Sequence, residues 1–230
     1  MCFNNISPII FYINILLNKN MNDYSYKLDK FLFPLISSVD KPNILEFGVQ
    51  NGTSTLKFLD ICNKNDGHLY SADVIDCSHI SNNPRWLFIK SRDDEFDLIK
   101  EKIPKEIDVV YLDSLHEASH VNKIFYAYYN MLKVGGYFFI DDISHLPYLK
   151  NKERNSFYCE INNRETFQEI LAIFNKNSDL FELNFSFYSS GLAIIKKVSD
   201  QKLNTKVNIL SREKSLKNIF RLIWKNLKKG

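Results

Sequence analysis

Apolar residues recur along the chain in short continuous runs that alternate with longer stretches of helical spacing. The short runs predict strands at residues 43–47, 68–73, 86–90, 107–112 and 137–140. The longer stretches predict helices at residues 24–38, 54–63, 94–102, 118–132 and 165–175. Near-continuous apolar runs are typical of parallel strands that are buried on both faces. The alternation therefore predicts an α/β fold with a doubly wound, mostly parallel sheet.

The later part of the chain departs from this alternation. Residues 181–188 and 192–196 are expected to form an antiparallel hairpin, which completes a seven-stranded sheet. The helix at 118–132 is expected to stop at Gly135 and Gly136, with glycine as its C-cap. Residues 143–163 look irregular and polar, and this region is expected to shape a substrate pocket.

A glycine-rich turn follows the first predicted strand, which carries Glu46 near its end. Gly48 and Gly52 come next, and Thr53 and Ser54 stand where a helical pattern begins. Glycine lets a ligand approach the backbone because it has no Cβ and tolerates positive φ. A helix start adds N–H groups that suit a carboxylate or a phosphate. The turn therefore predicts a ligand site, although its spacing is neither the dinucleotide fingerprint nor the P-loop.

Acidic residues stand at the carboxyl ends of the predicted strands, at Glu46, Asp73, Asp113, Asp141 and Asp142. In open α/β sheets, ligands bind at these strand ends, near the point where the strand order reverses. Asp73 is placed to accept hydrogen bonds from the ribose hydroxyls of a nucleoside. A helix cap or a solvated loop aspartate is the alternative interpretation of Asp73.

Several of these motifs resemble those of known enzymes. Residues 46–54 resemble motif I of the class I S-adenosylmethionine (SAM) methyltransferases, E-x-G-x-x-x-G-x-[ST]. Residues 111–116, 131–136 and 138–142 resemble the LD-x-x-H, LK-x-GG and DD segments of the metal-dependent small-molecule O-methyltransferases. That group includes catechol O-methyltransferase, the macrolide-sugar O-methyltransferases and the family named after cephalosporin hydroxylase. The catechol motif has Asn in place of Asp142, so the chain is more similar to the sugar-modifying relatives.

The resemblance covers about residues 40–197 and implies a Rossmann-like fold with SAM as cofactor. It implies that SAM is bound by Glu46, Gly48, Gly52, Thr53, Ser54, Asp73, Ser91, Asp93 and Asp113. Ser54 matches the hydroxyl that binds the methionine carboxylate, and Glu46 is expected to orient the glycine loop or the SAM amino group. Relatives contact adenine after the third strand, at Ser91 and Asp93, although Ser91-Arg92-Asp93 departs from the usual Gly-Asp-Ser order.

The same resemblance implies that Asp113, Asp141 and Asp142 ligate Mg²⁺. Clustered carboxylates repel one another unless a cation lies between them, and Mg²⁺ prefers carboxylate and water oxygens. A bound cation would lower the pKa of an acceptor hydroxyl. The alternative is that Asp113 contacts only SAM and that the Asp141-Asp142 pair caps a loop.

Three histidines compete for the role of general base. His116 lies three residues after Asp113, at the position where relatives carry a catalytic lysine or histidine, so His116 and Asp113 are the expected catalytic residues. The unperturbed pKa of histidine, ~6.5, suits proton abstraction near neutrality. His120, one helical turn later, and His145, after Asp142, are the alternatives. A surface histidine that is hydrogen-bonded to a neighbouring loop is the non-catalytic interpretation of His116.

Composition and charge restrict the class of protein. A chain of 230 residues with 45% apolar and 14% aromatic residues predicts a globular protein, and a net charge of +3 does not by itself predict a nucleic-acid partner. Four cysteines without metal-ligand spacing predict reduced thiols and a cytoplasmic location. The expected organisation is an N-terminal helical segment (1–39), a SAM-dependent methyltransferase domain (40–199) and a basic tail (200–230). The apolar run at 6–17 is too short to span a bilayer and is expected to pack as a helix.

The chain ends in a basic amphipathic pattern. Leu216, Ile219, Phe220, Ile223 and Leu227 share one helical face, and Lys and Arg lie mostly elsewhere. Basic amphipathic helices can lie on anionic membrane surfaces. Packing on the chain's own domain or on a second copy, as a homo-oligomer, is the alternative.

The first functional hypothesis is a SAM- and Mg²⁺-dependent O-methyltransferase acting on a sugar or another small hydroxylated acceptor, such as a glycan or glycolipid. A metal-independent methyltransferase is the second, and a non-catalytic SAM-fold protein in glycan assembly is the third. The clustered aspartates argue against a scaffold. An RNA methyltransferase is not expected, because motifs such as Asn/Asp-Pro-Pro-Tyr are absent from the sequence and its dense basic cluster is terminal.

Overall fold

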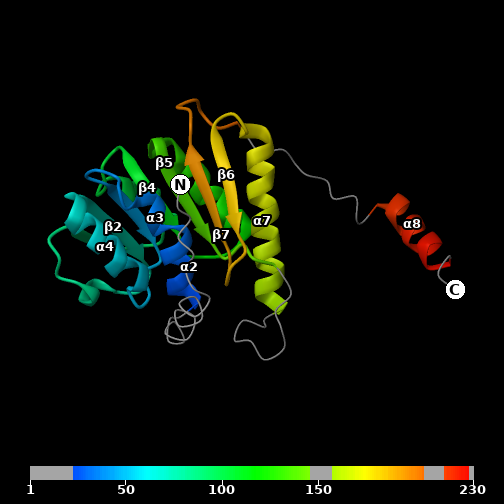
Figure 1. The fold of residues 1–230 in the computed structure, drawn as a ribbon, viewed down its shortest axis with the longest axis horizontal. Helices are drawn as coiled ribbons and strands as arrows, with labels where there is room; N and C mark the ends of the chain where they lie inside the picture. The colour runs from blue at the N-terminus through cyan, green and yellow to red at the C-terminus, as the bar shows by residue number, and fades with distance from the viewer. Residues whose placement is uncertain (1–22, 146–156, 205–214, 228–230) are drawn as a thin grey trace, which may run out of the picture.

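A computed structural model of the protein describes residues 23–145, 157–204 and 215–227, and Figure 1 shows its fold. The strands are β1 (Asn43–Phe47), β2 (His68–Asp73), β3 (Trp86–Lys90), β4 (Ile107–Leu112), β5 (Leu132–Asp141), β6 (Phe181–Ser186) and β7 (Leu192–Lys197). They form a seven-stranded sheet in the order β3-β2-β1-β4-β5-β7-β6. Strands β1 to β5 pair in parallel, and β7 runs antiparallel to β5 and β6. The predicted doubly wound sheet with an antiparallel C-terminal hairpin is confirmed.

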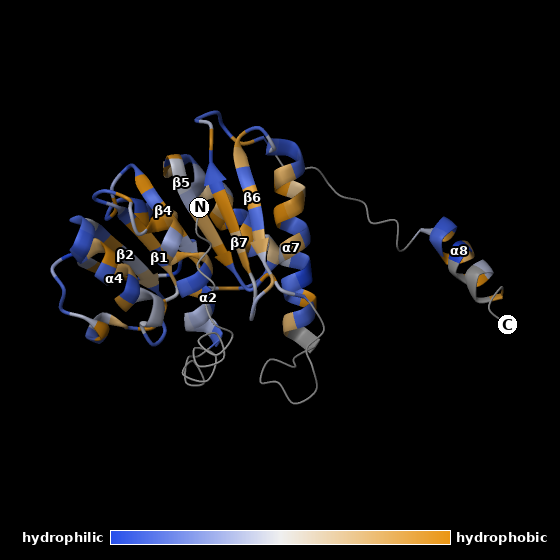
Figure 2. Cartoon of the chain, viewed as in Figure 1, coloured by the Kyte–Doolittle hydropathy of each residue, from blue (hydrophilic) through white to orange (hydrophobic). Residues whose placement is uncertain are grey.

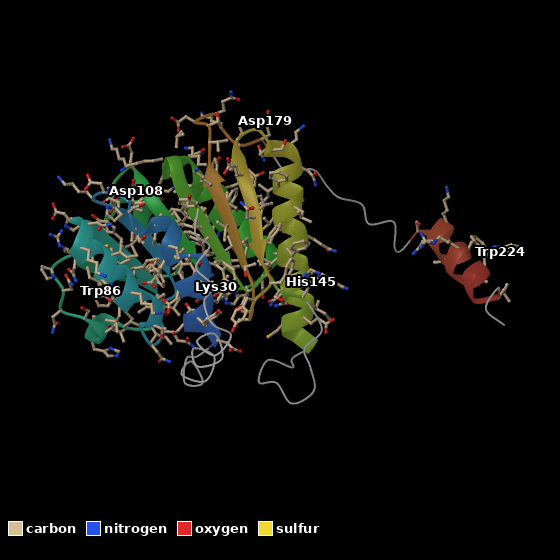
Figure 3. The ribbon with its side chains drawn as sticks, in the orientation of Figure 1. Lys30, Trp86, Asp108, His145, Asp179 and Trp224 are labelled. Carbon is tan, nitrogen blue, oxygen red and sulfur yellow. The ribbon has the colours of Figure 1, made fainter. Side chains whose placement is uncertain are left out.

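The strand order reverses between β1 and β4. The chain builds outward from β1 through β2 to β3 and then returns to the other side of β1, so that Ile44 is paired with both Leu69 and Val109. Figure 3 shows Asp108, near the start of β4, and His145, after the end of β5, at opposite edges of the sheet. The carboxyl ends of the parallel strands therefore meet at the His145 edge, where such folds form a crevice.

Helices cover both faces of this sheet. They are α2 (Asp23–Phe31), α3 (Phe33–Ile36), α4 (Thr53–Asn65), α5 (Phe96–Lys100), α6 (Ala118–Tyr128) and α7 (Phe157–Asn177), and α8 (Leu216–Leu227) follows the sheet. Alternate residues of β1 serve opposite cores: Ile44 packs with residues of α2 to α4, and Leu45 packs with residues of α6 and α7. Figure 2 shows the resulting apolar strands beneath helices that are polar on one side. Two buried faces explain why the strands appear in the sequence as near-continuous apolar runs.

Three local predictions are wrong. The helix expected at 24–38 is divided into α2 and α3, because Pro34 lies in the first turn of a new helix and cannot continue the preceding one. Gly135 and Gly136 lie inside β5 and do not cap a helix, and a Cβ on Gly136 would lie 2.7 Å from the carbonyl oxygen of Asp108. Helix α7 begins at Phe157, within the segment expected to be irregular.

Two predictions concern residues that the structure does not describe. The apolar run at 6–17 lies outside the described residues, and so does most of the predicted substrate-pocket segment, at 146–156. Within the described helices, none has both the length and the apolar character needed to cross a membrane.

Candidate active site

A cavity of about 620 Å³ opens at the carboxyl ends of the parallel strands, beside the point where the strand order reverses. Eight of the predicted site residues line it: Gly48, Thr53, Ser54, Asp73, Ser91, Asp93, Asp113 and His116. The volume lies within the range typical of small-molecule and cofactor sites. The structure therefore brings most of the predicted SAM-site residues to one cavity.

The glycine turn is held against the end of β4. Gly48 and Gly52 have φ values of +91° and +73°, in the region that glycine adopts most easily. A Cβ added to Gly48 would collide with the carbonyl oxygen of Asp113, so this glycine is required by the protein's own backbone as well as by any ligand. The sequence predicted only the approach of a ligand.

Glu46 lies behind the turn and does not line the cavity. Its buried carboxylate accepts hydrogen bonds from Ser54 Oγ (2.5 Å), Thr55 Oγ1 (2.8 Å) and Ser71 Oγ (2.7 Å). Burial raises the pKa of Glu46 to about 7, against the opposing effect of these hydrogen bonds. Of the two roles expected for Glu46, orientation of the glycine loop and the helix start is the one that the structure supports.

Asp73 joins the end of β2 to the glycine turn. Its Oδ2 accepts hydrogen bonds from the backbone N–H groups of Val49 (2.8 Å) and Gln50 (3.1 Å), and its Oδ1 accepts one from Ile75 (2.9 Å). The carboxylate also lines the cavity. Asp73 therefore fixes the shape of the glycine turn at the wall of the cavity.

The residues that follow β3 form another wall of the cavity. Asp93 Oδ2 accepts a hydrogen bond from Ser114 and lies 2.8 Å from Nε2 of His120. Ser91 Oγ donates to Glu95 Oε2 at 2.5 Å. His120 is only 8% exposed and is held by Asp93, so it is a poor candidate for the general base.

His116 lies between two carboxylates. Its Nε2 is 3.5 Å from Asp113 Oδ1, after β4, and 3.4 Å from Asp142 Oδ2, after β5. Its side chain remains 31% exposed and lines the cavity. His145, the other alternative, packs against the rings of Phe167 and Phe187. The imidazole of His116 is therefore the best placed of the three to receive a proton from a bound molecule.

Asp141 is paired with Lys27 of α2. Lys27 Nζ donates to Asp141 Oδ1 and also to Ser190 Oγ at 2.7 Å. The other carboxylate oxygen, Oδ2, accepts from Tyr111 at 3.0 Å. Asp141 is 1% exposed and Lys27 is fully buried. Despite the opposing effect of burial, the ammonium group of Lys27 lowers the pKa of Asp141.

Two tyrosines connect Asp141 to Asp113. The Tyr24 hydroxyl donates to Asp113 Oδ2 at 2.7 Å, and the Tyr111 hydroxyl, which donates to Asp141, lies 3.1 Å from the same Asp113 oxygen and 2.9 Å from the Tyr24 hydroxyl. Burial, and then the charge of Asp141, raise the pKa of Asp113 to about 6. The two aspartates are thus linked by hydroxyl groups.

The structure does not assemble the predicted set of three metal ligands. Asp113 and Asp142 converge on His116, whereas Asp141 is paired with the buried ammonium group of Lys27. Across the described ranges of the chain, no group of three or more His, Cys, Asp or Glu side chains is arranged to hold a metal ion. The described residues therefore place two of the three predicted carboxylates, Asp113 and Asp142, together at His116, and Asp141 apart from them in its ion pair with Lys27.

Helix α2 contributes two side chains to the site that were not predicted from the sequence. Tyr24 and Lys27 stand on the same helical face as Leu28 and Phe31, at the spacing that marks a buried stripe. A lysine on an apolar face is unusual, because a buried ammonium group requires a partner. The position of Lys27 on an apolar helical face was therefore a signal, in the sequence, of a buried ion pair. It does not identify Asp141 as the partner.

Comparisons with known proteins relate the chain to methyltransferases. Residues 45–143 match the family model described as a methyltransferase domain. A comparison with curated proteins finds no match. Among solved structures, the fold is similar to that of the MycE methyltransferase from the mycinamycin biosynthetic pathway, in complex with Mg and SAH. The two share 18% identity with a TM-score of 0.53, over 81% of this chain and 57% of MycE. The chain thus spans little more than half the length of MycE.

Two shorter proteins have the same fold. A candidate caffeoyl-CoA O-methyltransferase from Staphylococcus aureus is 20% identical, with a TM-score of 0.56, over 84% of this chain and 93% of that protein. The SAH-bound methyltransferase PaMTH1 from Podospora anserina is 12% identical, with a TM-score of 0.57, over 86% of this chain and 98% of that one. At these identities the structural likeness concerns the fold, and the family model adds the sequence match. Residues 45–143 therefore match a methyltransferase domain, and the sheet as a whole has the fold of the solved methyltransferases to which it is similar.

Proposed function

We propose that the protein transfers the methyl group of SAM to a hydroxyl oxygen of a sugar or another small hydroxylated acceptor. The observation that carries the proposal is the position of His116, which lies at the cavity between Asp113 and Asp142. A base at that place suits an acceptor whose oxygen must lose a proton. MycE, a methyltransferase of a biosynthetic pathway, has the same fold, which is consistent with a small-molecule acceptor.

SAM would lie along the cavity from the start of α4 to the end of β3. The first turn of α4, with Thr53 and Ser54, would receive the methionine carboxylate, because helix N-termini favour anions. Asp73 would accept hydrogen bonds from the ribose hydroxyls. Ser91 and Asp93 would border the adenine. This placement directs the sulfonium towards Asp113 and His116.

The chemical step is a displacement at the methyl carbon. The acceptor oxygen forms a bond to that carbon, the bond from the carbon to sulfur breaks, and S-adenosylhomocysteine leaves with the electron pair. The hydroxyl proton passes to the imidazole of His116. Asp113 and Asp142, whose oxygens lie 3.5 Å and 3.4 Å from its Nε2, stabilise the imidazolium that forms by their negative charge.

Asp113 and Asp142 are the residues that would hold Mg²⁺. Proteins commonly bind Mg²⁺ through one or two carboxylates and complete the shell with water and substrate oxygens. When bound, the ion would lower the pKa of the acceptor hydroxyl. We leave Asp141 out of the proposed ligand set, because Lys27 already provides it with a positive charge.

A metal-independent methyltransferase is the second candidate, and the buried Lys27 ammonium favours it. The ion pair partly neutralises the acidic cluster without a metal ion.

The test is methyl transfer from SAM to a panel of glycosides and catechols, in Mg²⁺ and in EDTA. Turnover that requires Mg²⁺ supports the first candidate, and equal turnover in EDTA supports the second. Tight SAM binding without transfer to any hydroxyl would favour the non-catalytic hypothesis.

A further inference from the structure

The C-terminal helix α8 presents an apolar face to solvent. Six apolar residues on it are 45–73% exposed: Leu216, Ile219, Phe220, Ile223, Trp224 and Leu227. Their spacing places them on one side of the helix. Figure 3 shows Trp224 on α8, which is drawn apart from the α/β sheet. A contiguous exposed apolar face of this kind marks an interaction surface.

The charge around this face indicates what would cover it. Residues 211–230 contain seven of the 30 Lys and Arg residues of the chain and one of its 27 Asp and Glu residues. This segment therefore has a net charge of +6, and the remaining 210 residues have a net charge of −3. Lys217 and Arg221 stand one helical turn apart beside the apolar face. A surface that accepts both the apolar face and the basic side chains of α8 must combine negative charge with an apolar interior.

We propose that α8 binds the surface of an anionic lipid bilayer. The helix has 12 residues, so it is too short to span the hydrocarbon core, which needs about 20. It would lie in the interface, with its apolar face among the acyl chains and Lys217 and Arg221 at the lipid phosphates. Trp224 would lie at the headgroup level, where tryptophan is enriched. The acidic remainder of the protein would stay away from the surface.

Vesicle co-sedimentation of the full-length chain tests the proposal. Vesicles of phosphatidylcholine alone are compared with vesicles that also contain phosphatidylglycerol, at low and high salt. The chain should pellet with the anionic vesicles and be released by salt, because charge attraction is screened. Lys217→Gln/Arg221→Gln should weaken binding roughly tenfold or more. Phe220→Ser/Ile223→Ser should abolish it.

A matched control removes apolar surface elsewhere. Leu87 and Leu98 are 41% and 40% exposed on β3 and α5, and Leu87→Ser/Leu98→Ser should pellet like the wild type. SAM binding by every variant confirms that its methyltransferase domain is folded. Brominated acyl chains should quench the fluorescence of Trp224 in the wild type, and Trp224→Phe should lose that quenching.

Two alternative coverings of the face give different results. If α8 packs on a second copy, the chain will sediment as a dimer without lipid, and Phe220→Ser/Ile223→Ser will make it monomeric. If α8 packs on its own domain, the wild type will stay in the supernatant with anionic vesicles. Either result, or equal binding to both kinds of vesicle, overturns the proposal.

Discussion

Lys27 of α2 and Asp141 at the end of β5 form a buried ion pair. The pair holds α2 against the carboxyl end of β5, next to the carboxylates at which we place the chemistry. A single buried charge is strongly unfavourable, whereas a paired charge is tolerated. The pair therefore makes the fold of the active-site edge depend on a helix that precedes the sequence motifs.

We predict that Lys27→Met lowers the free energy of unfolding by about 3–5 kcal/mol, because it leaves Asp141 buried without its cation. Chemical denaturation measures the change. Lys57→Met is the matched control, since the pair of Lys57 with Asp29 is partly exposed and should contribute no more than about 1 kcal/mol. The double variant Lys27→Met/Asp141→Asn should recover part of the loss. A loss in Lys27→Met no larger than in the control would contradict the buried pair.

The fold could be predicted from the sequence because it depends on local apolar runs and their order. β1, β2, β3 and β4 lie at the expected residues. The signal is clearest for β1 and β4, which are buried on both faces and are therefore largely apolar. The position of the glycines inside β5 was less accessible, because it depends on a tertiary contact, the close approach of the Asp108 carbonyl to Gly136. The break at Pro34 has a local cause, since proline cannot continue the preceding helix.

The residues of the candidate site that come directly after a strand could be predicted from the sequence. Asp73, Asp113 and His116 line one cavity, because parallel strands present their carboxyl ends at one edge. The separation of Asp141 from Asp142 could not be read from adjacent letters. The position of the Asp141 side chain depends on Lys27, which is 114 residues away in the chain. The backbone of Asp142 has a positive φ of 57°, unlike that of the strand residues before it.

SAM binding should depend on Asp73. Asp73→Ala should weaken it by about 1–3 kcal/mol, because the ribose hydroxyls lose a charged acceptor and the turn loses its hydrogen bonds to Val49 and Gln50. Calorimetric titration measures the affinity, with Asp76→Ala as a control on an aspartate outside the cavity. Unchanged affinity in Asp73→Ala would place the ribose elsewhere.

Gly48→Val is a poor test of SAM binding, because the Cβ of the new side chain would collide with Asp113 whether or not SAM binds.

Metal dependence, if Mg²⁺ is used, should follow Asp113 and Asp142. Asp142→Asn should raise the Mg²⁺ concentration needed for half-maximal turnover, because it removes a charged ligand next to His116. Asp141→Asn should instead destabilise the fold, because it leaves Lys27 without its carboxylate. Turnover against Mg²⁺ concentration and thermal unfolding separate the two effects. A shift in Mg²⁺ requirement in Asp141→Asn, with unchanged stability, would return Asp141 to the ligand set.

The stability of the protein should fall as the pH rises through the titration of Glu46. Burial raises its pKa from an ordinary value of 4.5 to about 7, so the folded state holds a proton that the unfolded state releases. The stabilisation is complete below pH 4.5 and is lost progressively up to about pH 7, by about 3 kcal/mol in total. Denaturation midpoints between pH 4 and 8 measure it, and Glu46→Gln should flatten this part of the curve. An equally steep curve in Glu46→Gln would assign the dependence to other groups.

His116→Ala should reduce kcat by about 10²–10⁴-fold, because the acceptor proton loses its base. SAM affinity should change little, since SAM would contact other parts of the cavity wall. The acid limb of the pH–rate profile should also disappear, because that limb reports protonation of the base. His120→Ala is the comparison. It should remove the hydrogen bond to Asp93 and lower the stability of the protein, yet keep the acid limb. If His116→Ala retains both its kcat and its acid limb, the proton leaves the acceptor by another route, and the proposed role of His116 is wrong.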